Sequence, residues 1–347
     1  MENNVIGVGI IGCGKIADVR HAPEYFQNKN VKILGFYDQN YERARAISER
    51  YDAKVYENHH ALLNNNEISA VSICTINSSH AQFAIDALNS KKHVLCEKPM
   101  ASSISECEQM IEAAKKNECL LMIGHNQRFS AAHKKAKEIL KSGELGNILG
   151  FKTSFGHGGP ESWGADKGTN TWFFNKKENI SGPLMDLGVH KIDLIKWLIS
   201  DEIVEVKASV TTVDKRYDNG NLVDVADNAI VILKFASNII GSLHASWVYY
   251  GYEDNSTILY CQKGIMKIYD DSENSIVVIK KDKERLTYQL NDIQTNDNQT
   301  ASGVIDSFVN SVINNLPAEV DAVDGMNTVK VTQACIESAL TGKTVCL

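Results

Sequence analysis

The sequence contains no long hydrophobic run, no long basic run and no C-x-x-C pair of cysteines. A membrane-spanning helix needs roughly 18 or more consecutive apolar residues, so we expect no membrane association. Lys and Arg number 36 against 43 Asp and Glu, which gives a formal net charge of −7. A mildly acidic chain of this kind is not typical of nucleic-acid-binding proteins.

The amino-terminal residues do not resemble an export signal. MENNVIGVGIIG carries an acid where a signal peptide has positive charge, its apolar run leads into a glycine-rich turn, and no twin-arginine follows. Three of the eight cysteines, Cys74, Cys96 and Cys119, fall in apolar, strand-like runs, where a free thiol behaves as a small hydrophobe. A chain of this size does not depend on disulfides, so we expect reduced thiols and a cytoplasmic protein.

The length and the order of the patterns predict two domains. The 347 residues, 43% hydrophobic and 23% charged, fit two globular domains of roughly 100–200 residues each. In the first, strands rich in Val, Ile and Cys alternate with helices. The strands are expected over 5–11, 31–37, 69–75, 93–97 and 119–124, and the helices over 17–28, 42–51, 79–90 and 103–117. This alternation predicts a doubly wound α/β domain with a buried parallel sheet over residues 1–125.

The pattern changes near residue 125. Helices are expected over 131–142, 184–199, 304–316 and 325–341, and strands over 148–154, 204–213, 226–235, 239–248, 256–260, 264–269 and 275–280. Ser237-Asn238 predicts a tight hairpin turn, and residues 291–300 predict a polar loop. Strands in such quick succession indicate a mainly antiparallel sheet in an α+β domain over residues 126–347.

A glycine-rich turn follows the first expected strand. Its G-x-G-x-x-A pattern allows a tight turn, close approach of the backbone to a pyrophosphate, and a following helix N-terminus that attracts negative charge. An overlapping G-x-G-x-x-G, Gly7-x-Gly9-x-x-Gly12, would leave only Val5 and Ile6 as the preceding strand, so its context is wrong. A purely structural turn is the alternative. The predicted pyrophosphate-binding residues are Gly12, Gly14, Lys15, Ile16 and Ala17.

Asp38 ends the second expected strand, where its carboxylate can accept hydrogen bonds from the adenosine ribose hydroxyls. It would repel a 2′-phosphate, and Gln39 and Asn40 follow it rather than an arginine. Asp38 therefore favours NAD over NADP. Its alternative role is that of a helix N-cap.

Three further polar segments follow expected parallel strands: residues 75–80 (TINSSH), 97–99 (EKP) and 125–128 (HNQR). Open α/β sheets bind ligands at the carboxyl ends of their strands. A charged Glu97-Lys98 pair at the end of an apolar strand is costly to bury without partners or a task. Pro99 restricts the backbone of Lys98 and helps to direct its side chain.

Residues 182–193 (GPLMDLGVHKID) place Asp186, His190 and Asp193 on one helix face, at spacings i, i+4 and i+7. A histidine flanked by carboxylates on an apolar helix is either a satisfied core histidine or a tuned acid/base. A further alternative is a metal site with the spacing Asp-x3-His-x2-Asp. No other His, Cys or carboxylate cluster of convincing spacing supports it, so we predict no metal.

The motifs GCGKIA, EKP and GPLMDLGVHxxD, in this order, resemble the glucose–fructose oxidoreductase/inositol dehydrogenase (Gfo/Idh/MocA) family over nearly the whole chain. The resemblance implies a Rossmann domain and NAD(P)-dependent chemistry at a sugar or polyol carbon. It also implies that the C-terminal α+β domain over residues 126–347 serves substrate binding and oligomerisation, through a large open sheet that often mediates dimers or tetramers. It implies that Lys98 is the active-site lysine, His190 the general acid/base and Asp186 its assisting acid. It implies a cofactor-side loop with Thr75, Asn77 and His80, to which we add Glu97 and Lys98. The family pattern has proline where this chain has Ile76, and often Gly-Gly where it has Gly182-Pro183.

These residues predict hydride transfer between nicotinamide C4 and a secondary alcohol or ketone carbon. His190 would move the hydroxyl proton, and Lys98 would stabilise charge on the reacting oxygen, in a cleft between the domains. Weaker substrate candidates are Asn126, Arg128, His157, Trp172 and Asp193. One alternative is an enzyme that recycles NAD and cleaves glycosides, and another is a non-catalytic nucleotide-binding sensor. The strand over 239–248 has one mixed face, which predicts a homodimer or homotetramer.

Overall fold

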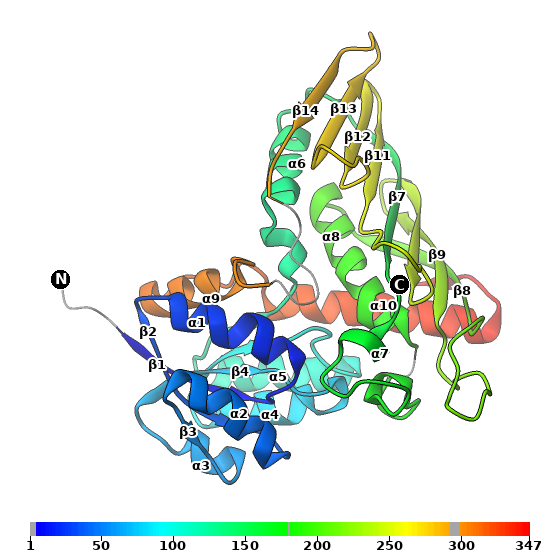
Figure 1. Ribbon diagram of the computed structural model, residues 1–347. Helices are drawn as coiled ribbons and strands as arrows, with labels where there is room; N and C mark the ends of the chain where they lie inside the picture. Colours follow the sequence, from blue (N-terminus) through cyan, green and yellow to red (C-terminus); the bar gives the residue numbers. More distant parts are fainter. Residues whose placement is uncertain (1–4, 180, 292–298) are drawn as a thin grey trace. The chain divides into compact units, whose positions relative to one another are not determined.

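The computed structural model describes residues 5–179, 181–291 and 299–347. The chain divides into two compact units (Figure 1). The first consists of Met1–His125, Trp163–Ala165 and Gln294–Val329, and the second of Asn126–Ser162, Asp166–Ile293 and Lys330–Leu347. The division into two continuous domains at residue 125 stays a prediction, and we describe each compact unit by itself.

The first unit contains a six-stranded parallel sheet in the order β3-β2-β1-β4-β5-β6. The strand order reverses between β1 and β4, which is where doubly wound sheets bind their ligands. The strands are β1 (Ile6–Ile11), β2 (Val31–Tyr37), β3 (Lys54–Val55), β4 (Ile68–Ile73), β5 (His93–Cys96) and β6 (Leu121–Ile123). The predicted Rossmann architecture is confirmed.

Three helices of the first unit, α2, α3 and α5, begin at side chains that cap their N-termini. Asn40 and Asn58 accept hydrogen bonds from backbone N–H groups in the first turns of α2 and α3, and Ser103 forms a capping box with Glu106 on α5. Neither β3 nor α3 was predicted, because two and five residues are too few for periodicity to show. The helices are α1 (Ala22–Gln27), α2 (Tyr41–Tyr51), α3 (His59–Leu63), α4 (His80–Asn89), α5 (Ile104–Lys116) and α9 (Val304–Asn314).

A late segment of the chain joins the edge strand of this sheet. The N–H of Ile123 donates to the carbonyl oxygen of Val320 at 3.1 Å, and Met122 forms an antiparallel bridge with Asp321. A Cβ on Gly325 would approach Ile123 and Met100 to 2.7 and 3.1 Å. The first unit therefore depends on residues far beyond position 125.

The second unit contains a nine-stranded sheet in the order β14-β13-β12-β11-β7-β10-β9-β8-β15. Only the pairing of β7 with β10 is parallel, so the predicted mainly antiparallel sheet is confirmed. Asn238, at φ 66°, forms the predicted turn between β9 and β10. The strands are β7 (Ile148–Gly156), β8 (Ile203–Thr211), β9 (Asn228–Phe235), β10 (Ile240–Ser246), β11 (Thr257–Cys261), β12 (Gly264–Ile268), β13 (Ile276–Lys280), β14 (Arg285–Tyr288) and β15 (Val345–Cys346).

Helices cover one face of this sheet (Figure 1): α6 (Ala131–Lys141) contacts β12, and α8 (Val189–Ile199) contacts β7. Leu243 and Ala245 of β10 are buried, whereas Ile240 on the other face is 52% exposed. The Lys137 ammonium donates to the backbone carbonyls at the C-terminus of α8 and so holds α6 to α8. The remaining helices are the short α7 (Pro160–Trp163) and α10 (Ala322–Thr341).

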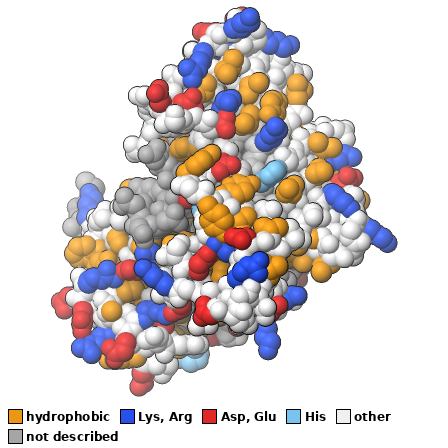
Figure 2. All heavy atoms as spheres, turned by 45° about the vertical axis from the view of Figure 1, so that its right-hand side comes forward, with side chains coloured by type: hydrophobic (Ala, Val, Ile, Leu, Met, Phe, Trp, Pro, Cys, Tyr) orange, Lys and Arg blue, Asp and Glu red, His pale blue; other side chains and the backbone are white. Residues whose placement is uncertain are grey.

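Charged side chains of both signs are interspersed with hydrophobic ones on the face that Figure 2 draws. Within the described residues, no helix combines the length and apolar character that a bilayer span requires. The predicted polar loop over 291–300 lies mostly outside the described residues.

Candidate functional site

The glycine turn after β1 has the backbone that close approach of a ligand requires. Gly12 has φ +91°, and a Cβ there would lie 2.6 Å from the carbonyl carbon of Cys74. A Cβ on Gly14 would meet nothing within 4 Å, so open space adjoins the turn. The overlapping Gly7 and Gly9 lie within β1 itself, as their context indicated. The turn fits a dinucleotide pyrophosphate.

The carboxylate of Asp38 is tied to this turn. Its Oδ2 accepts the Cys13 N–H at 2.7 Å, and its Oδ1 accepts the Asn40 N–H at 2.8 Å. Asn40 caps α2, so the alternative role of Asp38 as the helix N-cap is wrong. Burial raises the pKa of the Cys13 thiol, and the negative charge of Asp38 raises it further. A carboxylate has about four acceptor sites, so Asp38 keeps capacity for ribose hydroxyls.

The loop after β4 is joined to the loop after β5 through His80. One ring nitrogen of His80 lies 2.7 Å from the Pro99 carbonyl oxygen, and the other lies 3.1 Å from that of Thr75. Burial lowers the pKa of His80. Ile76 has φ −72° and ψ 154°, which is backbone that proline also adopts. The family proline and Ile76 are therefore compatible with the same loop, which also carries the buried Asn77.

Glu97 lies in a buried ion-pair network. Its Oε1 accepts from Arg20 Nη1 at 2.9 Å and lies 2.8 Å from His21 Nε2, while its Oε2 accepts the Lys98 N–H at 3.2 Å. Burial opposes the charge on Glu97, but the Arg20 guanidinium and His21 hold its pKa well below the usual range. The network fixes the backbone where the half-buried Lys98 begins.

Sequence reasoning did not identify Arg20 and His21. Both lie in the π-helical turn Ala17–His21, directly after the glycine turn, and Arg20 is 77 positions from Glu97. The sequence pattern Ala17–Asn28 predicted a helix but gave no signal that its first turn faces the end of β5.

In the second unit, Asp186 and His190 lie on one continuous helical segment. Asp186 belongs to the π-helical turn Leu184–Gly188, and His190 to the first turn of α8. Single π-helical turns are frequent at functional sites. Both side chains are buried. Trp247 Nε1 donates to Asp186 Oδ2 at 3.3 Å, and the His190 ring lies 5.6 Å from that of Phe155.

Asp193 and Arg128, two of the weaker substrate candidates, form a buried bidentate ion pair. Arg128 Nε and Nη2 donate to the two carboxylate oxygens of Asp193 at 2.8 and 2.6 Å. The pair joins the turn Asn126–Phe129 to α8. Asn126, another weaker substrate candidate, is buried in the same turn.

Lys191, which follows His190 in the sequence, is fully buried. Its ammonium donates to the Asn255 carbonyl oxygen at 2.9 Å and lies 5.9 Å from the centre of the Phe155 ring. Burial lowers the pKa of Lys191 to about 7, although the charges of Asp254 and Glu253 oppose the shift. No spacing in the sequence indicated this lysine.

The last two substrate candidates lie in the loop after β7. The Nδ1 of buried His157 accepts the Gly159 N–H at 3.0 Å. Trp172 is half-buried and stacks on Phe173, whose ring contacts that of the buried Trp247. The indole that donates to Asp186 is thus held by contacts between aromatic rings.

Two family models match the sequence in turn. Residues 6–125 match the oxidoreductase family with an NAD-binding Rossmann fold, and residues 133–267 match the GFO/IDH/MocA C-terminal domain. The first match includes the glycine turn, and the second includes the segment of Asp186 and His190.

Curated relatives are similar over most of the chain. A myo-inositol 2-dehydrogenase of Thermotoga maritima is 27% identical over 280 residues, covering 80% of this chain and 78% of that protein. A glucose-6-phosphate 3-dehydrogenase of Bacillus subtilis is 34% identical over 221 residues, covering 62% of this chain and 61% of that protein. The second match therefore spans less than two thirds of the relative.

A solved structure of similar fold is that of an aldose–aldose oxidoreductase from Caulobacter crescentus complexed with glycerol. It has a TM-score of 0.83 and 25% sequence identity, and the match covers 99% of this chain and 100% of that chain. The similarity extends through both units.

Proposed function

Since this chain belongs to the Gfo/Idh/MocA family of NAD-binding oxidoreductases, we propose that it is a dehydrogenase acting on a secondary hydroxyl group of a sugar, an inositol-like polyol or a sugar derivative. The match of both halves to the family, with relatives named as sugar and polyol dehydrogenases, is the observation that carries the proposal. A bound nicotinamide cofactor supplies the hydride acceptor or donor. The protein binds and orients the cofactor and the substrate, and it moves one proton.

In the first unit we assign the glycine turn from Gly12 to Ala17 to the pyrophosphate and Asp38 to the adenosine ribose. The open space beside Gly14 and the tether from Cys13 to Asp38 support this assignment. Thr75 and Asn77 are assigned to the cofactor-side loop. His80 and Glu97 support the loops, because their polar atoms face Pro99, Thr75, Arg20 and His21.

The first unit also supplies Lys98, whose ammonium would hydrogen-bond the reacting oxygen and stabilise negative charge on it. Glu97 fixes the backbone N–H of Lys98. A lysine presented from a fixed strand end loses less conformational freedom when it binds substrate than one on a mobile loop.

In the second unit we assign the proton transfer to His190, because an unperturbed imidazole titrates near neutral pH. Asp186 supports the imidazolium form, and Trp247 orients that carboxylate through its indole N–H. Arg128 and Asp193 hold this part of α8 through their ion pair, and His157 and Trp172 remain candidates for contact with the substrate.

Three further features belong to the proposal. NAD is preferred over NADP, because Asp38 opposes a 2′-phosphate. The chain forms a homodimer or homotetramer through the exposed face of β9 and β10, where Ile230, Ile232 and Ile240 are 46, 49 and 52% exposed. The enzyme works in the cytoplasm, as its eight unpaired thiols suggest.

A screen of inositols, aldoses and nucleotide sugars with NAD and with NADP tests the function. We expect stoichiometric accumulation of reduced nicotinamide with at least one sugar or polyol. Glycoside cleavage without net cofactor reduction would indicate the NAD-recycling enzyme, and cofactor binding without turnover would indicate a sensor. The comparisons favour neither alternative.

A further inference from the structure

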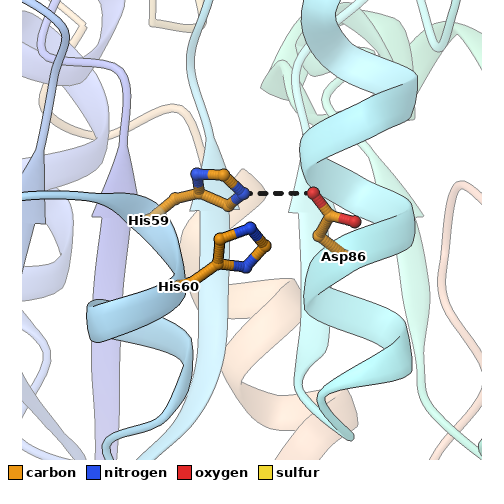
Figure 3. A group of neighbouring side chains, drawn as sticks. All are labelled: His59, His60 and Asp86. Atoms are coloured by element: carbon orange, nitrogen blue, oxygen red, sulfur yellow. Dashed lines mark hydrogen bonds and ion pairs between the residues drawn. The ribbon is translucent and has the colours of Figure 1, made fainter.

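Two adjacent histidines and an aspartate gather on the surface of the first unit. His59 and His60 begin α3, and Asp86 lies on α4 (Figure 3). Each offers one donor atom, and the three atoms lie within 4.8 Å of one another. His59 Nε2 is 3.1 Å from Asp86 Oδ2.

The separation of His59 Nε2 from Asp86 Oδ2 suits two ligands of one ion. Bonds of about 2.0–2.1 Å to an imidazole nitrogen and a carboxylate oxygen, at an angle near 100–110°, place these donors about 3.1–3.4 Å apart. The His60 ring lies beside that of His59, with centroids 3.9 Å apart, and His60 is exposed. Because His60 is exposed, its side chain has room to turn toward the other two donor atoms, which lie within 4.8 Å of its own.

The structure already holds two of the three donors in place. Gln82 Nε2 donates to both Asp86 oxygens at 3.0 Å, which orients the carboxylate. The His59 ring packs edge-on against Phe83 with ring centroids 4.9 Å apart, and it lies tilted against Tyr37 with centroids 5.8 Å apart. Contacts that orient the ligands in this way raise metal affinity, because the side chains lose less conformational freedom when the metal binds.

We propose that His59, His60 and Asp86 bind a divalent transition metal of the Zn²⁺ class and that the ion ties α3 to α4. Two imidazoles with one carboxylate suit Zn²⁺, Co²⁺ or Ni²⁺, whereas Mg²⁺ and Ca²⁺ prefer oxygen ligands throughout. Exposed His60 leaves the remaining coordination positions to water. None of the three residues has a role in the proposed dehydrogenase, so the two proposals are independent.

The sequence led us to predict no metal site, because two adjacent histidines form no spacing motif. Their carboxylate partner lies on another helix, 27 positions from His59. The parallel sheet brings α3 and α4 together, and they contact each other in the structure.

Calorimetric titration of the metal-free chain, without an affinity tag, with ZnCl₂ tests the site. We expect one Zn²⁺ per chain, and a loss of about tenfold or more in affinity for His60→Ala and for Asp86→Asn. Asp86→Asn keeps an oxygen that can face Gln82, and His60 is exposed, so both variants should fold. Circular dichroism and the unfolding temperature without metal confirm this.

The matched control is His244→Ala, which removes a partly exposed histidine from β10 in the second unit. It should bind Zn²⁺ as the wild type does. Zinc should raise the unfolding temperature of the wild type and of His244→Ala but not that of Asp86→Asn. Equal zinc affinity in the wild type, His60→Ala and Asp86→Asn would overturn the proposal, as would the absence of saturable binding.

Discussion

The backbone N–H of Cys13 donates to Oδ2 of Asp38 at 2.7 Å, so the carboxylate at the end of β2 holds the glycine turn that follows β1. The two residues are 25 positions apart in the chain, and each follows one of two neighbouring parallel strands, β1 and β2. Asp38 therefore has a structural task in the turn besides the ribose contact that we assign to it.

This tether shapes the cofactor prediction. Asp38→Ser with Gln39→Arg should shift the preference from NAD towards NADP, because the charge that opposes a 2′-phosphate is replaced by one that attracts it. The variant should also bind NAD more weakly than loss of ribose contacts alone implies, since the turn loses its acceptor. Titration of both cofactors by fluorescence measures the two effects.

The wild-type protein provides the decisive comparison, because tighter binding of NADP than of NAD would contradict the assignment. Arg43→Ala serves as the control. The positive charge of Arg43 acts on the Cys13 thiol and lowers its pKa against the larger effect of burial. If Arg43 held a 2′-phosphate, its loss would weaken NADP binding selectively.

The catalytic assignment predicts different losses at three positions. His190→Ala should reduce kcat about 10²–10⁴-fold, which is the usual contribution of general acid–base catalysis. Lys98→Ala should reduce kcat with little change in NAD affinity, because the pyrophosphate and ribose contacts remain. Asp186→Asn should cause a milder loss and a shifted pH profile, because it acts through the histidine. Steady-state kinetics across pH and NAD titrations distinguish these outcomes.

Trp247→Phe is the matched variant for Asp186. It removes the indole N–H that donates to Asp186 while it keeps an aromatic ring for the contact with Phe173. Its pH profile should shift as that of Asp186→Asn does. Near-normal kcat in folded His190→Ala would return the histidine to a core role and require another base.

The buried Lys191 predicts a pH-dependent contribution to stability. Its pKa falls from 10.5 in a model peptide to about 7 in the folded chain, so between these values the unfolded chain binds more protons. The free energy of unfolding should therefore rise with pH through this window, by at most about 1.4 kcal/mol per pH unit from this group. Lys191→Met should abolish this contribution.

Urea unfolding of the wild type and of Lys191→Met at about pH 7 and pH 9.5 measures the contribution of Lys191 to the free energy of unfolding. The stability of the wild type relative to the variant should increase with pH, because the cost of burying the ammonium disappears as the lysine loses its proton. A difference that is the same at both values would show that Lys191 does not titrate in this range.

The exposed face of β9 and β10 predicts an oligomer. Ile232→Glu places a charge among exposed isoleucines, and in an interface core that charge would be desolvated without a partner. We expect the wild type to sediment as a dimer or tetramer and Ile232→Glu to shift towards the monomer. Leu340→Glu on α10 is the charge-matched control, because it also replaces an exposed apolar side chain by a glutamate but lies on neither β9 nor β10. A wild type that stays monomeric at all concentrations would refute the prediction.

The sequence alone determined the order of the elements and most of the residues that carry chemistry. Hydrophobic periodicity and glycine spacing act over a few residues, so they located β1, its glycine turn, Asp38 and the segment around Asp186 and His190. Two-residue β3 and β15, and four-residue β14, are too short for such periodicity, and their pairing with a neighbouring strand defines them.

Only the tertiary structure decided which residues from distant parts of the chain contact the residues of the candidate site. Arg20 and His21 reach Glu97 because the π-helical turn after β1 faces the end of β5, and Trp247 reaches Asp186 across 61 positions. His59, His60 and Asp86 meet only because α3 and α4 are in contact. Such contacts depend on how strands pair and helices pack, and local sequence spacing carries no information about either.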